Sequence, residues 1–202
     1  MKNIFCLLLL LLSATACRKE TAPHEDTETL YWRFHGKYKA VRSTSSEPVD
    51  VNFDGQASAD LLEELPDLSR ANVEILVNRY RRQGPGGKSL SYFTFSQFWP
   101  EQSLSAKGGY DANPTSYDPE VSVSYLLQGV IWGFDFDPLI TRIHLRPEES
   151  SASDPARWPP PESITLEANN EIRVATRKRL YTREGWKTVE IVTLYRRYTM
   201  DS

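Results

Sequence analysis

The sequence predicts an all-β fold, an antiparallel up-and-down barrel of about eight strands in one domain (residues 30–202), with a β-sandwich as the alternative. Short apolar and aromatic stretches with a period of two recur along the chain. Clusters of Gly, Pro, Asn and Ser separate them, and a helix is predicted only for the short stretch LLEEL, residues 61–65, after the first strand. Eight meandering strands suit a small closed barrel because closure removes the exposed sheet edges.

The strands follow one another along the chain with mostly short connections. The stretch SLSYFTFSQFW, residues 89–99, alternates clearly between two faces. Residues 169–170 and 182–185 are typical of tight turns between the last three strands. The predicted strands cover residues 37–44, 73–77, 89–99, 121–136 (one or two strands), 139–145, 163–168, 171–181 and 186–198. The long loops are expected at residues 105–120 and 147–161.

The N-terminus predicts export and attachment to lipid. Residues 1–16 contain one lysine, the apolar run IFCLLLLLL and the small residues SATA, a combination typical of a signal peptide and too short to span a bilayer comfortably. Small residues directly before Cys17 resemble the lipobox of bacterial lipoproteins, which implies cleavage before Cys17 and its acylation. An ordinary secretory signal is the alternative. With residues 17–29 as a lipidated, polar tether, we expect an outer-membrane lipoprotein on the periplasmic face or the cell surface.

Charge and cysteine content exclude several classes of function. Without residues 1–16 the chain has 23 Lys and Arg minus 27 Asp and Glu, a net charge of −4. This balance argues against binding of nucleic acid, which needs a strongly basic surface. Cys6 lies in the signal peptide and Cys17 takes the lipid, so the domain has neither a disulfide nor a cysteine metal site. The roughly 170 residues that remain are enough for a core of their own, and we expect a monomer.

The stretch VDVNFDGQASADLLEEL, residues 49–65, is similar to a calcium loop followed by a helix. Alternate residues from Asp50 onward carry side-chain oxygens, as in EF-hand and dockerin loops, and Gly55 permits the sharp turn. The candidate ligands are Asp50, Asn52, Asp54, Gln56 (through its backbone carbonyl) and Asp60.

The end of this loop departs from the pattern. An acid is expected at the twelfth position, where Leu61 stands, and Asp60 comes one residue earlier. A loop shortened by one residue would let Asp60 coordinate a structural calcium that orders the connection between the first two strands. The alternative is a turn followed by a helix that Asp60 caps, with Glu63 three residues later as in a capping box.

The stretch HGKYKAV, residues 35–41, resembles the first strand of lipocalins, in which Gly-x-Trp is usual and Tyr38 takes the place of the Trp. In lipocalins an arginine near the last strand packs over that aromatic ring, and Arg196 or Arg197 stands at the matching place. Together with the lipoprotein start, these features resemble lipocalin-like lipoproteins of Bacteroidota. The resemblance implies a calyx-shaped barrel and a binding role, not a reaction.

Two functional hypotheses follow, and no ligand-binding residue is identified for either. In the first, the lipid-anchored barrel binds a small apolar or amphipathic (lipophilic) ligand. In the second, an envelope interaction protein has a barrel filled by aromatic side chains and binds a protein or glycan through its loops. The size and polarity of the cavity discriminate between them.

The last two strands are basic, and no enzyme is expected. Arg173, Arg177 and Arg179 share one face of residues 171–181, which is either a solvated outer face or a grip for an anionic ligand. No catalytic residue is assigned, because the sequence has neither a Gly-x-Ser-x-Gly motif nor a cysteine nucleophile after processing. A hydrolase with paired carboxylates such as Asp135 and Asp137 is the remaining alternative. The three histidines, His24, His35 and His144, are too scattered to indicate a zinc site.

Overall fold

The fold is given by a computed structural model that describes residues 26–78, 93–152 and 158–201. The predicted signal peptide, the lipidation site Cys17 and the first four residues of the strand predicted from residue 89 lie outside these ranges. Within them, no helix is long and apolar enough to cross a membrane.

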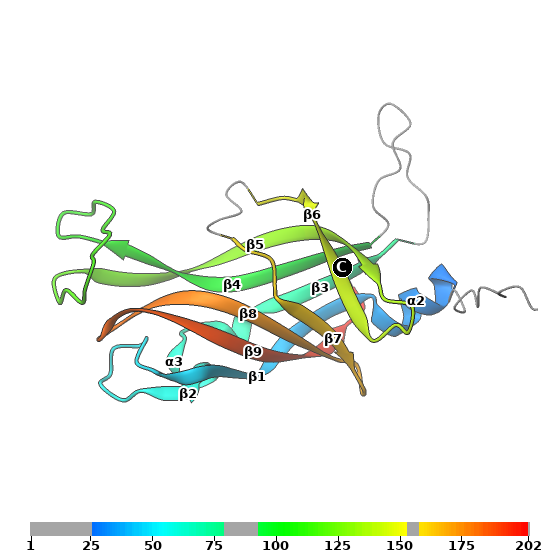
Figure 1. The fold of residues 1–202 in the computed structure, drawn as a ribbon, viewed down its shortest axis with the longest axis horizontal. Coiled ribbons are helices and arrows are strands. Elements are labelled where there is room, and N and C mark those ends of the chain that lie inside the picture. Colours follow the sequence, from blue (N-terminus) through cyan, green and yellow to red (C-terminus); the bar gives the residue numbers. More distant parts are fainter. Residues whose placement is uncertain (1–25, 79–92, 153–157, 202) are drawn as a thin grey trace, which may run out of the picture.

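An antiparallel sheet closes on itself into a barrel (Figure 1). The strands are β1 (Gly36–Val49), β2 (Ser58–Asp60), β3 (Asn72–Val77), β4 (Phe93–Ser105), β5 (Ser122–Phe136), β6 (Arg142–Ser150), β7 (Ser163–Glu167), β8 (Glu171–Thr182) and β9 (Gly185–Thr199). Each strand from β3 to β9 pairs with the next, and β1 joins β3 to β9, so eight strands form the barrel. β2 is an extra strand on the second half of β1. The predicted all-β, up-and-down barrel is confirmed.

Helix α2 (Thr27–Phe34) lies at one end of the barrel, at the right of Figure 1. It begins at Thr27 because the Asp26 carboxylate accepts a hydrogen bond from the Thr29 amide at 2.8 Å. The helix therefore includes residues 27–29, which the sequence assigned to the tether. Its buried side chains join the core, and the Phe34 ring lies 5.1 Å from that of Phe136.

Arg197 fastens this helix to the barrel. Its guanidinium donates to the backbone oxygens of Trp32 and Arg33 at 3.1 and 2.9 Å, near the C-terminal end of α2, where a cation is favourable. Tyr38 lies beside it, and burial raises the pKa of its hydroxyl to about 12, although Arg197 acts in the opposite direction. Of the two arginines considered from the sequence, Arg197 therefore accompanies Tyr38, whereas Arg196 forms an exposed ion pair.

The sheet is loosely joined at β6 and β7, which pair only at Arg142↔Thr165 and Ile143↔Ile164. β7 then follows β8 as far as Ala175. In the part of the chain that the structure describes, the remaining half of β8 therefore has no strand on that edge, although it pairs with β9 on the other. This opening in the barrel wall becomes the candidate site.

The start of β6 differs from the sequence prediction, which began this strand at residue 139. The Asp137 carboxylate accepts backbone hydrogen bonds from Thr141 and Arg142, both at 2.6 Å, and so closes a turn. Ile140 takes a positive φ of 54° in this turn, and Leu139 is 80% exposed. Although burial acts to raise the pKa of Asp137, these hydrogen bonds outweigh it and leave the pKa below its usual value. Asp137 thus serves as a turn residue.

Helix α3 (Leu61–Glu64) and a 3₁₀ turn (Leu68–Arg70) cover the opposite end of the interior. Their buried leucines pack with Trp99 of β4 and with Leu180, Val189 and Ile191 of β8 and β9. A second cluster, nearer α2, contains the rings of Phe95, Trp132, Phe134 and Tyr195. The core therefore runs along the whole barrel axis.

Candidate functional site

The middle of the barrel is filled. Phe95 and Phe134 are fully buried, Trp132 is 3% exposed, and the rings of Phe95 and Trp132 lie 6.3 Å apart. The cavity beside Trp99 and Trp132 has a volume of about 10 Å³, at the lower limit for a single water molecule. Among the described residues, the space left beside Trp99 and Trp132 is thus far smaller than a ligand of the size that a calyx would take.

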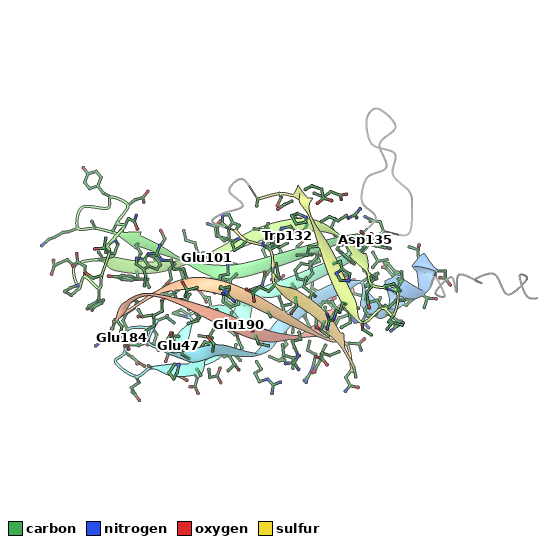
Figure 2. All side chains as sticks on the ribbon, viewed as in Figure 1. Glu47, Glu101, Trp132, Asp135, Glu184 and Glu190 are labelled. Atoms are coloured by element: carbon green, nitrogen blue, oxygen red, sulfur yellow. The ribbon has the colours of Figure 1, made fainter. Side chains whose placement is uncertain are left out.

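A much larger crevice of about 820 Å³ lies in the opening beside β8. Glu101, which is labelled in Figure 2, belongs to β4 and lines this crevice. Its volume is within the range of ordinary ligand sites. A hollow over β1, β8 and β9 is smaller, at about 450 Å³. The crevice is lined by residues of β4 (Glu101, Gln102, Ser103, Leu104), of the β4–β5 connection (Asp111, Ala112, Asn113), of β8 (Arg177, Lys178, Arg179, Leu180), of β9 (Trp186, Thr188) and by Pro159.

Gln102 bridges the opening at one point. Its Oε1 accepts a hydrogen bond from the Tyr181 amide at 2.7 Å, and its Nε2 donates to the Tyr181 carbonyl at 2.8 Å. One side chain thus replaces a neighbouring strand for this residue of β8, whose backbone groups would otherwise lack partners. The β4–β5 hairpin is thereby held against β8, and the crevice has a fixed wall.

An ion pair lies at the inner end of the crevice. Lys178 and Glu101 are in contact, with side chains only 13% and 23% exposed. The Lys178 ammonium also lies 5.8 Å from the ring centre of Trp99 and 5.5 Å from that of Trp158. Both distances are within the range of cation–π attraction. A charged pair between aromatic rings is therefore available to polar groups of a ligand.

Trp99 adds a donor beside this ion pair. It is 2% exposed, and its indole Nε1 has no hydrogen-bond partner among the residues that the structure describes. Buried polar groups without partners are uncommon because their loss of hydration is not compensated. The small cavity that Trp99 lines shares Lys178 and Pro159 with the crevice, so this donor lies next to the larger site.

The calcium-like loop connects β1 to β2 at the end of the barrel where β8 turns into β9. The Asp50 carboxylate accepts from the Gly55 amide, five residues later, at 3.0 Å through Oδ2. The side chains of Asn52 and Asp54 each accept from the amide two residues later, at 2.9 and 2.7 Å. Oδ2 of Asp50 also lies 3.3 Å from Nε of Arg183. Oδ1 of Asp50 is buried and has no partner within the described part of the chain. The structure thus brings Asp50, Asn52 and Asp54 together.

The other two predicted ligands are placed differently. Asp60 caps helix α3, because its Oδ1 accepts from the Leu62 amide at 2.9 Å, as the alternative interpretation expected. Gln56 is exposed in the loop. In the described ranges, no group of three or more His, Cys, Asp or Glu side chains is arranged to hold a metal ion.

Sequence reasoning missed Glu64, which is 2% exposed and accepts from the Val51 amide at 3.1 Å. Burial raises its pKa, and the nearby charges of Asp50 and Asp54 raise it further, whereas backbone hydrogen bonds lower it. The available signal was its spacing of three residues from Leu61, which places Glu64 on the apolar face of the short helix.

Comparison of the chain with protein-family models, with curated proteins and with solved structures gives no match.

Proposed function

We propose that this protein is a lipid-anchored envelope protein with a filled barrel, which binds a small saccharide in the crevice beside β8. The proposal shares the filled barrel and the glycan with the second hypothesis from the sequence, but it places the ligand in a crevice between strands and not on the loops. The observation that carries it is the contrast between a lumen cavity of about 10 Å³ and a crevice of about 820 Å³. An apolar or amphipathic ligand in the lumen stays a prediction that this contrast does not favour.

The chemistry of the crevice supports a polar ligand. Most small-molecule sites are lined by apolar side chains with a few polar groups. Here the charged pair of Lys178 and Glu101 and the polar side chains of Asn113 and Ser103 line the same space as the Trp186 ring. Sugars present hydroxyl groups that both donate and accept hydrogen bonds, and C–H faces that pack on aromatic rings, so they match this lining.

Native mass spectrometry of the purified protein with maltotriose, chitotriose and trigalacturonate tests the proposal. At least one trisaccharide should bind with one-to-one stoichiometry. Ser103→Trp, which fills the crevice, should abolish this binding. Ser69→Trp, an exposed serine on the 3₁₀ turn, is the matched control and should leave it unchanged. Binding that survives Ser103→Trp, or the absence of binding for all three probes, would contradict the proposal.

We further propose that residues 50–64 bind a structural calcium ion, with Glu64 as an additional carboxylate. The support is the buried Oδ1 of Asp50, which lacks a partner among the described residues, and the raised pKa of Glu64 beside Asp50 and Asp54. Neighbouring buried carboxylates repel one another, and a divalent cation would relieve that repulsion. Arg183 supplies the positive charge in the structure as it stands.

Thermal unfolding with calcium and with chelator checks this second proposal. Calcium should raise the melting temperature of the protein, and Asp50→Asn should remove the effect. Asp118→Asn changes an acid of the β4–β5 connection and should retain it. Without calcium, Glu64→Gln should stabilise the protein at neutral pH, because the folded pKa of Glu64 is raised and its ionisation costs stability as the pH rises through that pKa. An equal melting temperature with and without calcium would refute the metal site.

A further inference from the structure

Three consecutive cations of β8 line the crevice, but their partners differ. Nε of Arg177 lies 2.9 Å from Oε1 of Glu162, and Lys178 pairs with Glu101. For Arg179, no carboxylate lies within ion-pair distance in the part of the chain that the structure describes. Among the described residues, Arg179 is thus the cation of the crevice lining that has no carboxylate partner.

Arg179 is held in place by an aromatic ring. Its guanidinium carbon lies 4.4 Å from the ring centre of Trp186. Trp186 is itself fixed, because its indole Nε1 donates to the Pro114 carbonyl at 2.8 Å and its ring lies 5.3 Å from that of Tyr181. A guanidinium stacked on a ring keeps the N–H donors at its edge available for planar acceptors, and less side-chain entropy is lost when it binds one.

Neither acid of the crevice lining forms an ion pair with Arg179 in the described part of the chain. Glu101 is already paired with Lys178. Asp111 is exposed, and its backbone is held beside β4 through a bridge to Ser105. The lining has three cations and two acids, but Arg177 has its partner in Glu162, outside the lining. Within the described ranges, Arg179 and Asp111 are therefore the charged side chains of the lining that belong to none of these ion pairs.

The same strand supplies a comparison. Arg173, on the same face of β8 but outside the crevice, pairs with Glu167 at 2.7 Å. The two interpretations of this basic face, a solvated surface and a site for an anionic ligand, thus apply to different residues of the strand. Arg173 belongs to a solvated outer face, whereas Arg179 has the position of an anion grip.

We propose that the saccharide bound in the crevice carries an acidic group, a carboxylate or a phosphate, and that Arg179 binds this group. The inference rests on the proposed function and adds the charge of the ligand. Carboxylate and phosphate oxygens match the fork of N–H groups on arginine, and such charge-assisted hydrogen bonds are stronger than neutral ones.

Calorimetric titration with trigalacturonate and with its fully methyl-esterified form tests the inference, because the two probes differ in charge but share their rings. The acid should bind about tenfold more tightly than the ester. This ratio of affinities corresponds to the contribution of one charge-assisted hydrogen bond. Arg179→Gln retains a planar group over Trp186 and should remove this difference. Arg173→Gln is the matched control on the same strand and should preserve it. Added salt should weaken binding of the acid and not of the ester.

A second arm distinguishes the source of the anionic sugar. Vesicles of phospholipid with and without lipopolysaccharide present phosphorylated sugar at a membrane surface, and sedimentation with either kind measures binding. Binding of lipopolysaccharide vesicles that Arg179→Gln weakens would support the inference with a membrane source. Equal affinity for acid and ester, unaffected by Arg179→Gln, would overturn the inference and leave crevice binding intact. Absence of binding for acid, ester and vesicles would overturn the proposed function as well.

Discussion

Gln102 should contribute more to stability than a half-buried glutamine ordinarily does. In Gln102→Met, the new side chain has a similar size but no hydrogen-bonding group. The amide and the carbonyl of Tyr181, which is fully buried, therefore each lose their partner. An unsatisfied buried polar group costs about 1–3 kcal/mol, so two of them predict a loss of about 2–6 kcal/mol, or about 1–3 kcal/mol if crevice water replaces one of the two bonds. Equilibrium unfolding in urea measures this free energy.

A second substitution separates the two hydrogen bonds. Gln102→Glu keeps an acceptor for the Tyr181 amide but places an oxygen against the Tyr181 carbonyl at neutral pH. Protonation of the new carboxyl restores a donor, so its stability relative to the wild type should recover as the pH falls. Gln56→Met, in an exposed position, is the control and should change the free energy by less than about 0.5 kcal/mol. A Gln102→Met variant as stable as this control would refute the bridging role.

Three further predictions concern the closure of the barrel. Arg197→Met should lower the free energy of unfolding by about 2–4 kcal/mol through loss of its charge-assisted hydrogen bonds. Arg196→Met, which removes an exposed ion pair, should cost at most about 1 kcal/mol, and urea unfolding compares the two variants. Gly36→Ala should cost about 2 kcal/mol or more, because φ is 131° and the added Cβ would lie 2.3 Å from a backbone oxygen. Gly109→Ala, with φ at 84° but open space around it, should cost only about 1 kcal/mol in the same assay. Burial raises the pKa of the Tyr195 hydroxyl to about 12, so its stabilising contribution is complete below the unfolded value near pH 10 and is lost as the pH rises through the folded value. Ultraviolet titration should show this tyrosine ionising with alkaline unfolding, and ionisation near pH 10 in the folded protein would contradict its burial.

The strand pattern could be predicted because it depends on neighbours in the chain. Alternation in residues 171–181 and 186–198 fixes which side chains face the interior, and the four residues between them close a hairpin. The structure has this hairpin, with Tyr181 opposite Trp186. Asp60 likewise caps the helix that follows it, a contact over two residues.

The candidate site was less accessible to sequence reasoning. The sequence places Arg173 and Arg179 on the same face of one strand. Which of them has an ion-pair partner depends on the carboxylates that other strands bring near. The sequence does not indicate the bridging role of Gln102, because a glutamine in a strand predicts only an exposed or half-buried position. Its partner Tyr181 is 79 residues away, and no local pattern indicates the pairing.

The sequence by itself determined the eight alternating strands, their antiparallel order and the short capped helix, because these depend on side-chain period and on turns of a few residues. Only the tertiary structure decided that the lumen is filled and that the wall opens beside β8. The opening depends on how far β6 and β7 continue to pair, which is two positions here, and therefore on the summed geometry of all the strands. Cavity volume arises in the same way, from side chains distant in sequence that meet across the barrel, such as Phe95 and Trp132.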